Sequence, residues 1–174
     1  MTTLIALLRG INVGGTGILP MADLRALCEK AGFTDVRTYI QSGNVVLSSA
    51  LSASKTKVAL EAALSKRLHK HYPVLIRTPD ELEAVIAANP FPEAAPNQLI
   101  IVFLDNERDE SALDGWKIPG NERLAIRGRE LYVHFPEGQG TSKLKLPFAG
   151  EGTGRNLNTA RKLLEMARAG IIPG

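Results

Sequence analysis

The chain has 174 residues, of which 44% are hydrophobic and 22% charged, a composition that excludes intrinsic disorder and allows one domain or two small ones. Its single cysteine, Cys28, excludes an internal disulfide and any metal site built from several thiolates. The apolar run near the N-terminus spans about five residues, which is too short for a signal peptide or a membrane span. We therefore expect a cytoplasmic protein with no membrane partner.

The net charge of +3 conceals an uneven distribution along the chain. Residues 1–78 carry ten Lys and Arg against four Asp and Glu, residues 79–116 carry one against nine, and residues 117–174 carry ten against five. Two basic blocks thus flank an acidic one. Two interpretations remain open: the basic blocks share a face that binds an anionic partner, or they neutralise the acidic block within the fold.

The first half of the chain predicts a ferredoxin-like domain over residues 1–90. A buried strand at 4–8 precedes a helix that starts at Pro20 and stops at Gly32, with Cys28 on its apolar side as a core thiol. Strands at 35–40 and 44–49 form a hairpin, and a helix with Ser54 as its expected cap leads to a strand in PVLIRT. The order strand, helix, strand, strand, helix, strand is typical of the ferredoxin-like plan. Thr78, Pro79 and Glu81 then predict the capped start of a further helix, which ends at Asn89-Pro90.

The second half predicts a C-terminal α+β domain over residues 97–174, after the proline-rich connection FPEAAPNQ. The pattern indicates a strand at 99–104, a short acidic helix in ERDESALDGW, a hairpin turning near Gly128, a short helix over 141–148 and a final helix. The predicted fold class is therefore α+β, with two ferredoxin-like (βαββαβ-type) halves, mainly antiparallel sheets and helices packed on one face.

The segment LLRGINVGG, residues 7–15, follows the first strand and invites comparison with nucleotide-binding loops. It lacks the Lys-Ser/Thr of a Walker A motif, and Pro20 interrupts the spacing of a dinucleotide fingerprint. The glycines expose backbone N–H groups and Arg9 is a bidentate donor, a combination suited to an anion. A plain strand-to-helix turn is the alternative.

Two further segments place uncharged polar groups at turns. TYIQSGNVV carries Gln41, Ser42 and Asn44 at a hairpin tip, which is more than a turn requires. GTGRNLNTARK surrounds the expected start of the final helix, where Asn156 suits an N-cap. Capping does not explain Arg155, because a cation at a helix start is unfavourable unless an anion joins it.

These three segments lack the side chains that most often act as acids, bases or nucleophiles, because they contain no Asp, Glu, His or Cys. His69 and His71 lie at a basic helix end and are expected to be solvated, and His134 falls on the polar face of its strand. No metal site is predicted, any cofactor is unknown, and no general base or catalytic residue can be identified.

Together, LLRGINVGG, TYIQSGNVV and RNLNT resemble the bacterial family catalogued as domain of unknown function 1697, over nearly the whole chain. The resemblance implies a compact α/β protein with two ferredoxin-like halves, and the family has no established activity. Its signature also covers Gly10, Tyr39 and Gly43. Where the family usually has Trp between the two asparagines of the last motif, this chain has Leu157, whose place on the apolar stripe favours a core role.

We therefore expect a phosphorylated small molecule or nucleotide to bind in a cleft between the two halves. An RNA-binding module that uses basic sheet surfaces is less favoured, because the chain has few aromatic residues. An enzyme acting on a phosphorylated substrate is a third hypothesis. The candidate ligand-binding residues are Arg9, Asn12, Gly14, Gly15, Gln41, Ser42, Asn44, Arg155, Asn156, Asn158 and Thr159.

Overall fold

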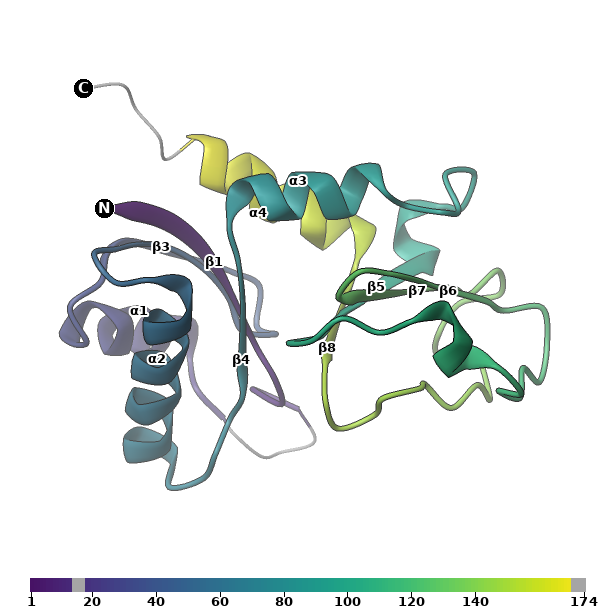
Figure 1. Ribbon diagram of the computed structural model, residues 1–174. Coiled ribbons are helices and arrows are strands. Elements are labelled where there is room, and N and C mark those ends of the chain that lie inside the picture. Colours follow the sequence, from purple (N-terminus) through teal and green to yellow (C-terminus); the bar gives the residue numbers. More distant parts are fainter. Residues whose placement is uncertain (14–17, 170–174) are drawn as a thin grey trace. The chain divides into compact units, whose positions relative to one another are not determined.

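The structure, a computed structural model, describes residues 1–13 and 18–169 (Figure 1). The chain divides into two compact units. Unit 1 comprises Met1–Leu82 and the chain from Leu163 onward, and unit 2 comprises Glu83–Lys162. Each unit contains one four-stranded antiparallel sheet. The expected division into domains over residues 1–90 and 97–174 stays a prediction.

Unit 1 has the element order that the sequence predicts, with a sheet in the order β2-β3-β1-β4. The strand β1 lies in the middle and pairs antiparallel with β3 and β4, and all residues from Leu4 to Leu8 are buried, as the apolar run predicts. The elements are β1 (Thr2–Leu8), α1 (Met21–Lys30), β2 (Thr34–Tyr39), β3 (Asn44–Ser49), α2 (Ala53–Leu68) and β4 (Val74–Arg77).

The core of unit 1 lies between this sheet and the helices α1 and α2, which share one face of the sheet (Figure 1). Alternate residues of β1 point into it, as the period of two in a strand requires. Ser52, and not the expected Ser54, caps α2 by accepting a hydrogen bond from the Lys55 N–H at 3.2 Å. The core residues from β1, α1 and α2 are Leu4, Ala6, Leu8, Leu24, Cys28, Leu60 and Leu64.

Helix α3 (Pro79–Ala87) begins with the predicted capping box. The Thr78 hydroxyl accepts from the Glu81 N–H at 3.1 Å, and the Glu81 carboxylate accepts from the Thr78 N–H at 2.8 Å. Two N–H groups that the helix leaves without a partner are thereby satisfied. The helix ends at Ala87, slightly before the expected Asn89-Pro90 stop.

Unit 2 repeats the strand order of unit 1, with the sheet β6-β7-β5-β8. Leu131 and Val133 on β7 face the core, whereas His134 points to the opposite face, as the alternation predicts. The elements are η1 (Pro96–Gln98), β5 (Leu99–Phe103), η2 (Glu110–Leu113), β6 (Arg123–Arg127), β7 (Glu130–His134), β8 (Thr153–Asn156) and α4 (Leu157–Ala169).

One expectation for the second half is wrong, and two others are incomplete. No helix forms over 141–148, because Leu144, Leu146 and Phe148 pack against the core at a period of two, which is typical of an extended chain. The short helix expected in the acidic segment after β5 is the 3-10 helix η2. The residues before the final helix form the edge strand β8, so that Arg155 lies in a strand paired with β5.

The described residues thus form a mixed α+β protein with two four-stranded antiparallel sheets and four α-helices. The ferredoxin-like topology of each half stays a prediction.

Candidate functional site

Two of the three predicted segments meet in unit 1, and the side chain of Asn12 joins them. Its Nδ2 donates to the carbonyl oxygens of Leu19 at 3.0 Å and Gln41 at 2.8 Å, while its Oδ1 accepts from the Leu19 N–H at 2.7 Å. Asn12 has a φ of 58°, a left-handed conformation that asparagine tolerates better than most residues. One amide therefore fixes the loop after β1 to the turn between β2 and β3.

The register of the sheet explains why these segments converge. Leu8 pairs with Val74 and Leu7 pairs with Asn44, so the end of β1 lies beside the starts of β3 and β4. The Leu8 N–H donates to the Gly43 carbonyl and the Arg9 N–H donates to the Pro73 carbonyl, both at 2.9 Å. We call residues 9–12, 40–43 and 69–73 the loop end of unit 1.

Gly43 holds this turn against the core. Its φ is 79°, and a Cβ there would lie 2.9 Å from the Leu8 Cβ and 3.3 Å from the Ile11 Cβ.

Beside Gly43, the Asn44 Nδ2 donates to the Tyr39 carbonyl and to the Ser42 hydroxyl, both at 3.0 Å. Asn44 is fully buried, so its polar group builds the turn. Gln41 is exposed and Arg9 is partly exposed.

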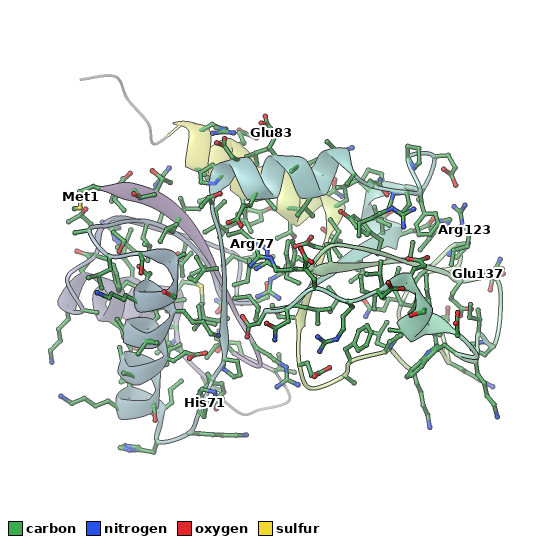
Figure 2. All side chains as sticks on the ribbon, viewed as in Figure 1. Met1, His71, Arg77, Glu83, Arg123 and Glu137 are labelled. Atoms are coloured by element: carbon green, nitrogen blue, oxygen red, sulfur yellow. The ribbon has the colours of Figure 1, made fainter. Side chains whose placement is uncertain are left out.

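The loop end of unit 1 carries cationic side chains. Lys70 lies over the Tyr72 ring at 5.8 Å, and His69 and His71 are exposed, as expected; Figure 2 labels His71 at this end of the unit. Helix α1 begins after Pro20, which supplies no capping side chain. A helix N-terminus carries partial positive charge and attracts anions. The loop end thus combines Arg9 and Lys70 with a helix start.

The ion pairs show where the basic blocks meet the acidic block of the chain. In unit 2, Arg127 pairs with Glu110 at 3.5 Å and Arg123 pairs with Glu93, so cations of the last block meet the acidic block inside one unit. Unit 2 has 10 Lys and Arg against 11 Asp and Glu, whereas unit 1 has 11 against 7. The excess positive charge therefore resides on unit 1.

The third predicted segment lies in unit 2, where Arg155 belongs to β8 and lies two residues before the expected helix start at Leu157. Its Nη1 donates to the Thr153 hydroxyl at 2.5 Å and to the Gly154 carbonyl at 2.9 Å. Burial lowers the pKa of this guanidinium to about 10. That the three segments form one site stays a prediction. Two of the predicted site residues, Gly14 and Gly15, lie outside the described residues.

Asn156 is the N-cap of α4, as its type suggests. Its Oδ1 accepts from the Thr159 N–H at 2.9 Å, which satisfies a donor of the first helical turn. Asn158 is exposed, whereas Thr159 is buried. Leu157 is 2% exposed, which confirms the core role expected for the residue that replaces the family's Trp.

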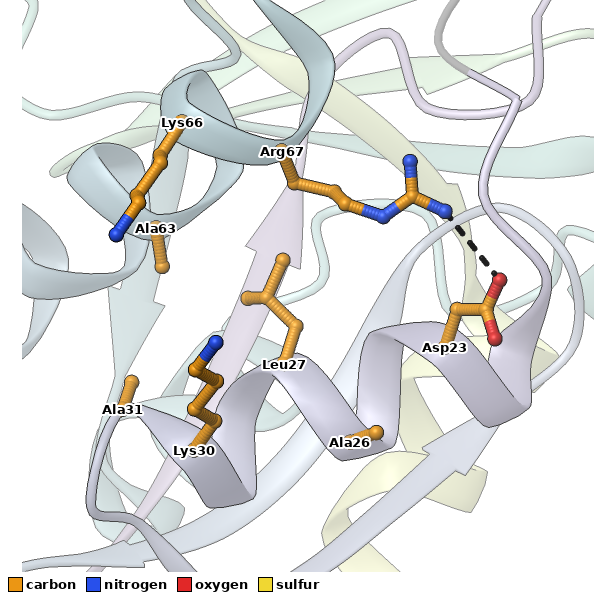
Figure 3. Close-up of a pocket in the computed structure, with 8 residues that line it drawn as sticks. All are labelled: Asp23, Ala26, Leu27, Lys30, Ala31, Ala63, Lys66 and Arg67. Atoms are coloured by element: carbon orange, nitrogen blue, oxygen red, sulfur yellow. Dashed lines mark ion pairs between the residues drawn. The ribbon is translucent and has the colours of Figure 1, made fainter.

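A hollow of about 600 Å³ lies between α1 and α2, outside the predicted segments (Figure 3). Leu27 and three alanines form its apolar surface. Asp23 pairs with Arg67 at 3.6 Å, while Lys30 and Lys66 have no ion-pair partner within the described part of the chain. None of the sequence-predicted site residues lines this hollow.

The sequence reasoning missed two clusters in unit 2. Arg123, labelled in Figure 2, donates to the His134 Nδ1 from its Nη2 at 2.8 Å and from its Nε at 3.2 Å, and it lies 4.4 Å over the Phe91 ring. Trp116, Lys143 and Lys145 line a second hollow. These residues are far apart in sequence, and only the alternation on β7 and along 143–146 gave a local signal.

Over residues 1–13 and 18–169, no group of three or more His, Cys, Asp or Glu side chains is placed to hold a metal ion. Within the same residues, no helix has the length and apolar character that crossing a membrane requires.

The model of one protein family, described as protein of unknown function (DUF1697), matches residues 1–132. No curated protein matches the chain. Among solved structures, the chain is similar to the conserved bacterial protein SP0830 from Streptococcus pneumoniae. The TM-score is 0.78 and the identity 24%, over 95% of this chain and 98% of that chain. At this identity the likeness supports the fold alone.

Proposed function

Because the chain belongs to the family described as protein of unknown function (DUF1697), whose description names no activity, we propose a function from the loop end of unit 1. This end binds a phosphorylated small molecule or nucleotide. The observation that carries the proposal is the pair of Asn12 hydrogen bonds to the Leu19 and Gln41 carbonyls, which ties the loop that carries Arg9 to the turn that carries Gln41.

The chemistry of this surface suits a phosphate group. Arg9 offers a planar fork of N–H donors that matches phosphate oxygens, and the Gln41 carboxamide adds a neutral donor. The net positive charge of unit 1 attracts anions over a longer range. Holding the loop and the turn rigid before binding reduces the entropy that binding would otherwise cost.

The test measures thermal stability with inorganic phosphate, sugar phosphates, AMP and ATP. A ligand that binds only the folded chain raises the melting temperature. We expect at least one phosphate ester to do so, and Arg9→Gln to weaken its affinity about tenfold to a hundredfold, as the loss of charge-assisted hydrogen bonds implies. Arg25→Gln is the matched control, because Arg25 is an exposed residue of α1 whose one ion-pair partner among the described residues is Glu29.

Arg155→Ala forms a separate arm: loss of the shift in this folded variant would add the third segment to the site, and an unchanged shift would confine the site to the loop end of unit 1. Circular dichroism of each variant shows that it folds. A panel in which no phosphate ester raises the melting temperature, or a shift that survives Arg9→Gln unchanged, would contradict the proposal.

A further inference from the structure

A hollow of about 460 Å³ in unit 2 surrounds the only tryptophan of the chain. No residue of the loop end and no predicted site residue belongs to its lining, and its volume falls within the usual range for small-molecule sites. Its lining consists of Gly115, Trp116, Lys117, Pro119, Lys143 and Lys145.

The indole of Trp116 is anchored at its polar edge. Its Nε1 donates to the Lys145 carbonyl at 2.7 Å, and the backbone N–H of Trp116 donates to the Leu113 carbonyl at 3.0 Å. Trp116 nevertheless remains 39% exposed. Because its one polar atom already has a partner, the indole offers a ligand only its apolar π-surface, which suits stacking with another flat ring.

Three ammonium groups line the same hollow. Leu144 and Leu146 pack against the core of unit 2, so the alternation of an extended chain directs Lys143 and Lys145 outward, and Lys117 adds a third cation next to Trp116. None of the three lysines has an ion-pair partner in the described part of the chain. Like charges gathered around one hollow raise the local concentration of anions.

The walls of the hollow are tied together by Glu122. Its carboxylate accepts from the Ser142 hydroxyl at 2.6 Å and from the Gly120 N–H at 3.0 Å, and the Ser142 hydroxyl accepts from the Leu144 N–H at 3.1 Å. These bonds hold the chain that follows Trp116 against the chain that carries Lys143 and Lys145. The indole and the backbone that carries Lys143 and Lys145 are therefore positioned before any ligand arrives.

We propose that this hollow binds an aromatic base that bears phosphate, with the base stacked on Trp116 and the phosphates at Lys117, Lys143 and Lys145. Aromatic platforms within basic surfaces are how proteins hold single-stranded nucleic acid without reading its sequence, and a free nucleotide offers the same chemistry. A stack on an anchored ring explains the exposure of Trp116 better than insertion into lipid, since the bond to the Lys145 carbonyl holds the indole to the protein surface.

The experiment uses the fluorescence of Trp116 in the full chain at low salt, titrated with oligo(dT), AMP or ATP. Stacking of a base quenches this fluorescence in a saturable manner. Quenching by AMP and ATP assigns the free nucleotide, and quenching by oligo(dT) alone assigns single-stranded nucleic acid. Anisotropy of a fluorescein-labelled oligo(dT), or of a labelled ATP where free nucleotide is the ligand, then compares variants that lack the tryptophan.

Trp116→Leu is expected to lower the affinity about tenfold, whereas Trp116→Phe retains most of it because a phenyl ring still stacks. Lys143→Gln/Lys145→Gln lowers the affinity for oligo(dT) and reduces the slope of log affinity against log salt by about 1.4, since each phosphate contact on a single strand contributes about 0.7. Lys55→Gln/Arg161→Gln removes the same charge from exposed positions outside the hollow and serves as the control.

Three outcomes would overturn the proposal. The first is no quenching by any of the three probes at low salt. The second is binding that Trp116→Leu and Lys143→Gln/Lys145→Gln leave unchanged, or that the control pair weakens equally. The third is a blue shift of Trp116 with vesicles of anionic phospholipid without binding of nucleotide or oligo(dT), which would assign the surface to lipid. The Arg9→Gln variant leaves this site intact, so the two proposals fail separately.

Discussion

Gly43 occupies a position that only glycine fits without strain, for two separate reasons. Its φ of 79° is unfavourable for a side chain, and a Cβ would press against Leu8 and Ile11, which are buried. We expect Gly43→Ala to lower the free energy of unfolding by about 2–4 kcal/mol, since the left-handed backbone costs about 1–2 kcal/mol and overpacking a similar amount. Urea denaturation followed by circular dichroism measures the change.

Gly32 provides the matched control for Gly43. Its φ is 100°, and a Cβ there has no heavy atom within 4 Å. Gly32→Ala should therefore show only the backbone cost, about 1–2 kcal/mol. Equal losses for the two variants would show that the contact with Leu8 and Ile11 does not hold the turn.

His134 predicts a loss of stability in weak acid. Its pKa lies below the ordinary value of 6.5, first because of burial and then because of the Arg123 charge, while Glu93 opposes the shift. The unfolded chain therefore takes up this proton at a higher pH than the folded chain. The stability from neutral His134 is complete above pH 6.5 and is lost as pH falls from there toward the folded pKa.

Denaturation at a series of pH values tests this linkage. His134→Gln should flatten the dependence of the free energy of unfolding on pH below 6.5, where the unfolded imidazole titrates. His71→Gln is the control, because His71 is exposed. A dependence that both variants leave as it is in the parent chain would assign the effect to other groups.

At the scale of elements, the capping box of α3 offers a measurable contribution. Thr78→Ala removes the acceptor for the Glu81 N–H and should cost about 1 kcal/mol, whereas Thr78→Ser keeps the hydroxyl and most of the stability. Thermal denaturation of the two variants compares them directly. If both variants lose the same amount, the cap is not the source of the stability.

The sequence predicted those elements whose signals are local. The capping box at Thr78, the hairpin around Gly43 and the cap at Asn156 depend on residues within a few positions of each other. β8 was missed because its pairing with β5 joins residues about fifty positions apart. The helix expected over 141–148 does not form, because Leu144 and Leu146 alternate in an extended chain, and a segment this short carries too few residues to separate the two periods.

The candidate site was predictable in part, for the same reason. Asn12, Gln41 and Gly43 belong to segments that the sequence singled out, but only the pairing of β1 with β3 brings them together. The sequence predicts Arg155 beside the start of the final helix, where it lies, but its place in a strand follows from tertiary pairing. The hollow around Trp116 depends on a carbonyl 29 positions away and had no signal of its own.

At the scale of the whole molecule, the two units share two helices along the chain. The boundary between the units falls after Leu82 within α3 and after Lys162 within α4. In unit 1 the ends of these helices are joined by the ion pair between Asp80 and Arg168 at 2.8 Å, and in unit 2 the Tyr132 hydroxyl donates to the Val85 carbonyl at 2.5 Å. Each unit therefore requires part of both helices.

We expect the two units to unfold together, because short helices form cooperatively and losing one part of α3 or α4 destabilises the rest. The chain carries one natural reporter in each unit. Cys28 is buried in unit 1, and burial, with a smaller contribution from Glu29, raises the pKa of its thiol to about 12. Trp116 lies in unit 2.

In a urea titration, the reactivity of Cys28 toward a thiol reagent and the fluorescence of Trp116 should change with one common midpoint. Gly43→Ala, a change in unit 1 alone, should shift both midpoints equally. A shift of the Cys28 transition that leaves the Trp116 transition in place would show that the shared helices do not couple the units.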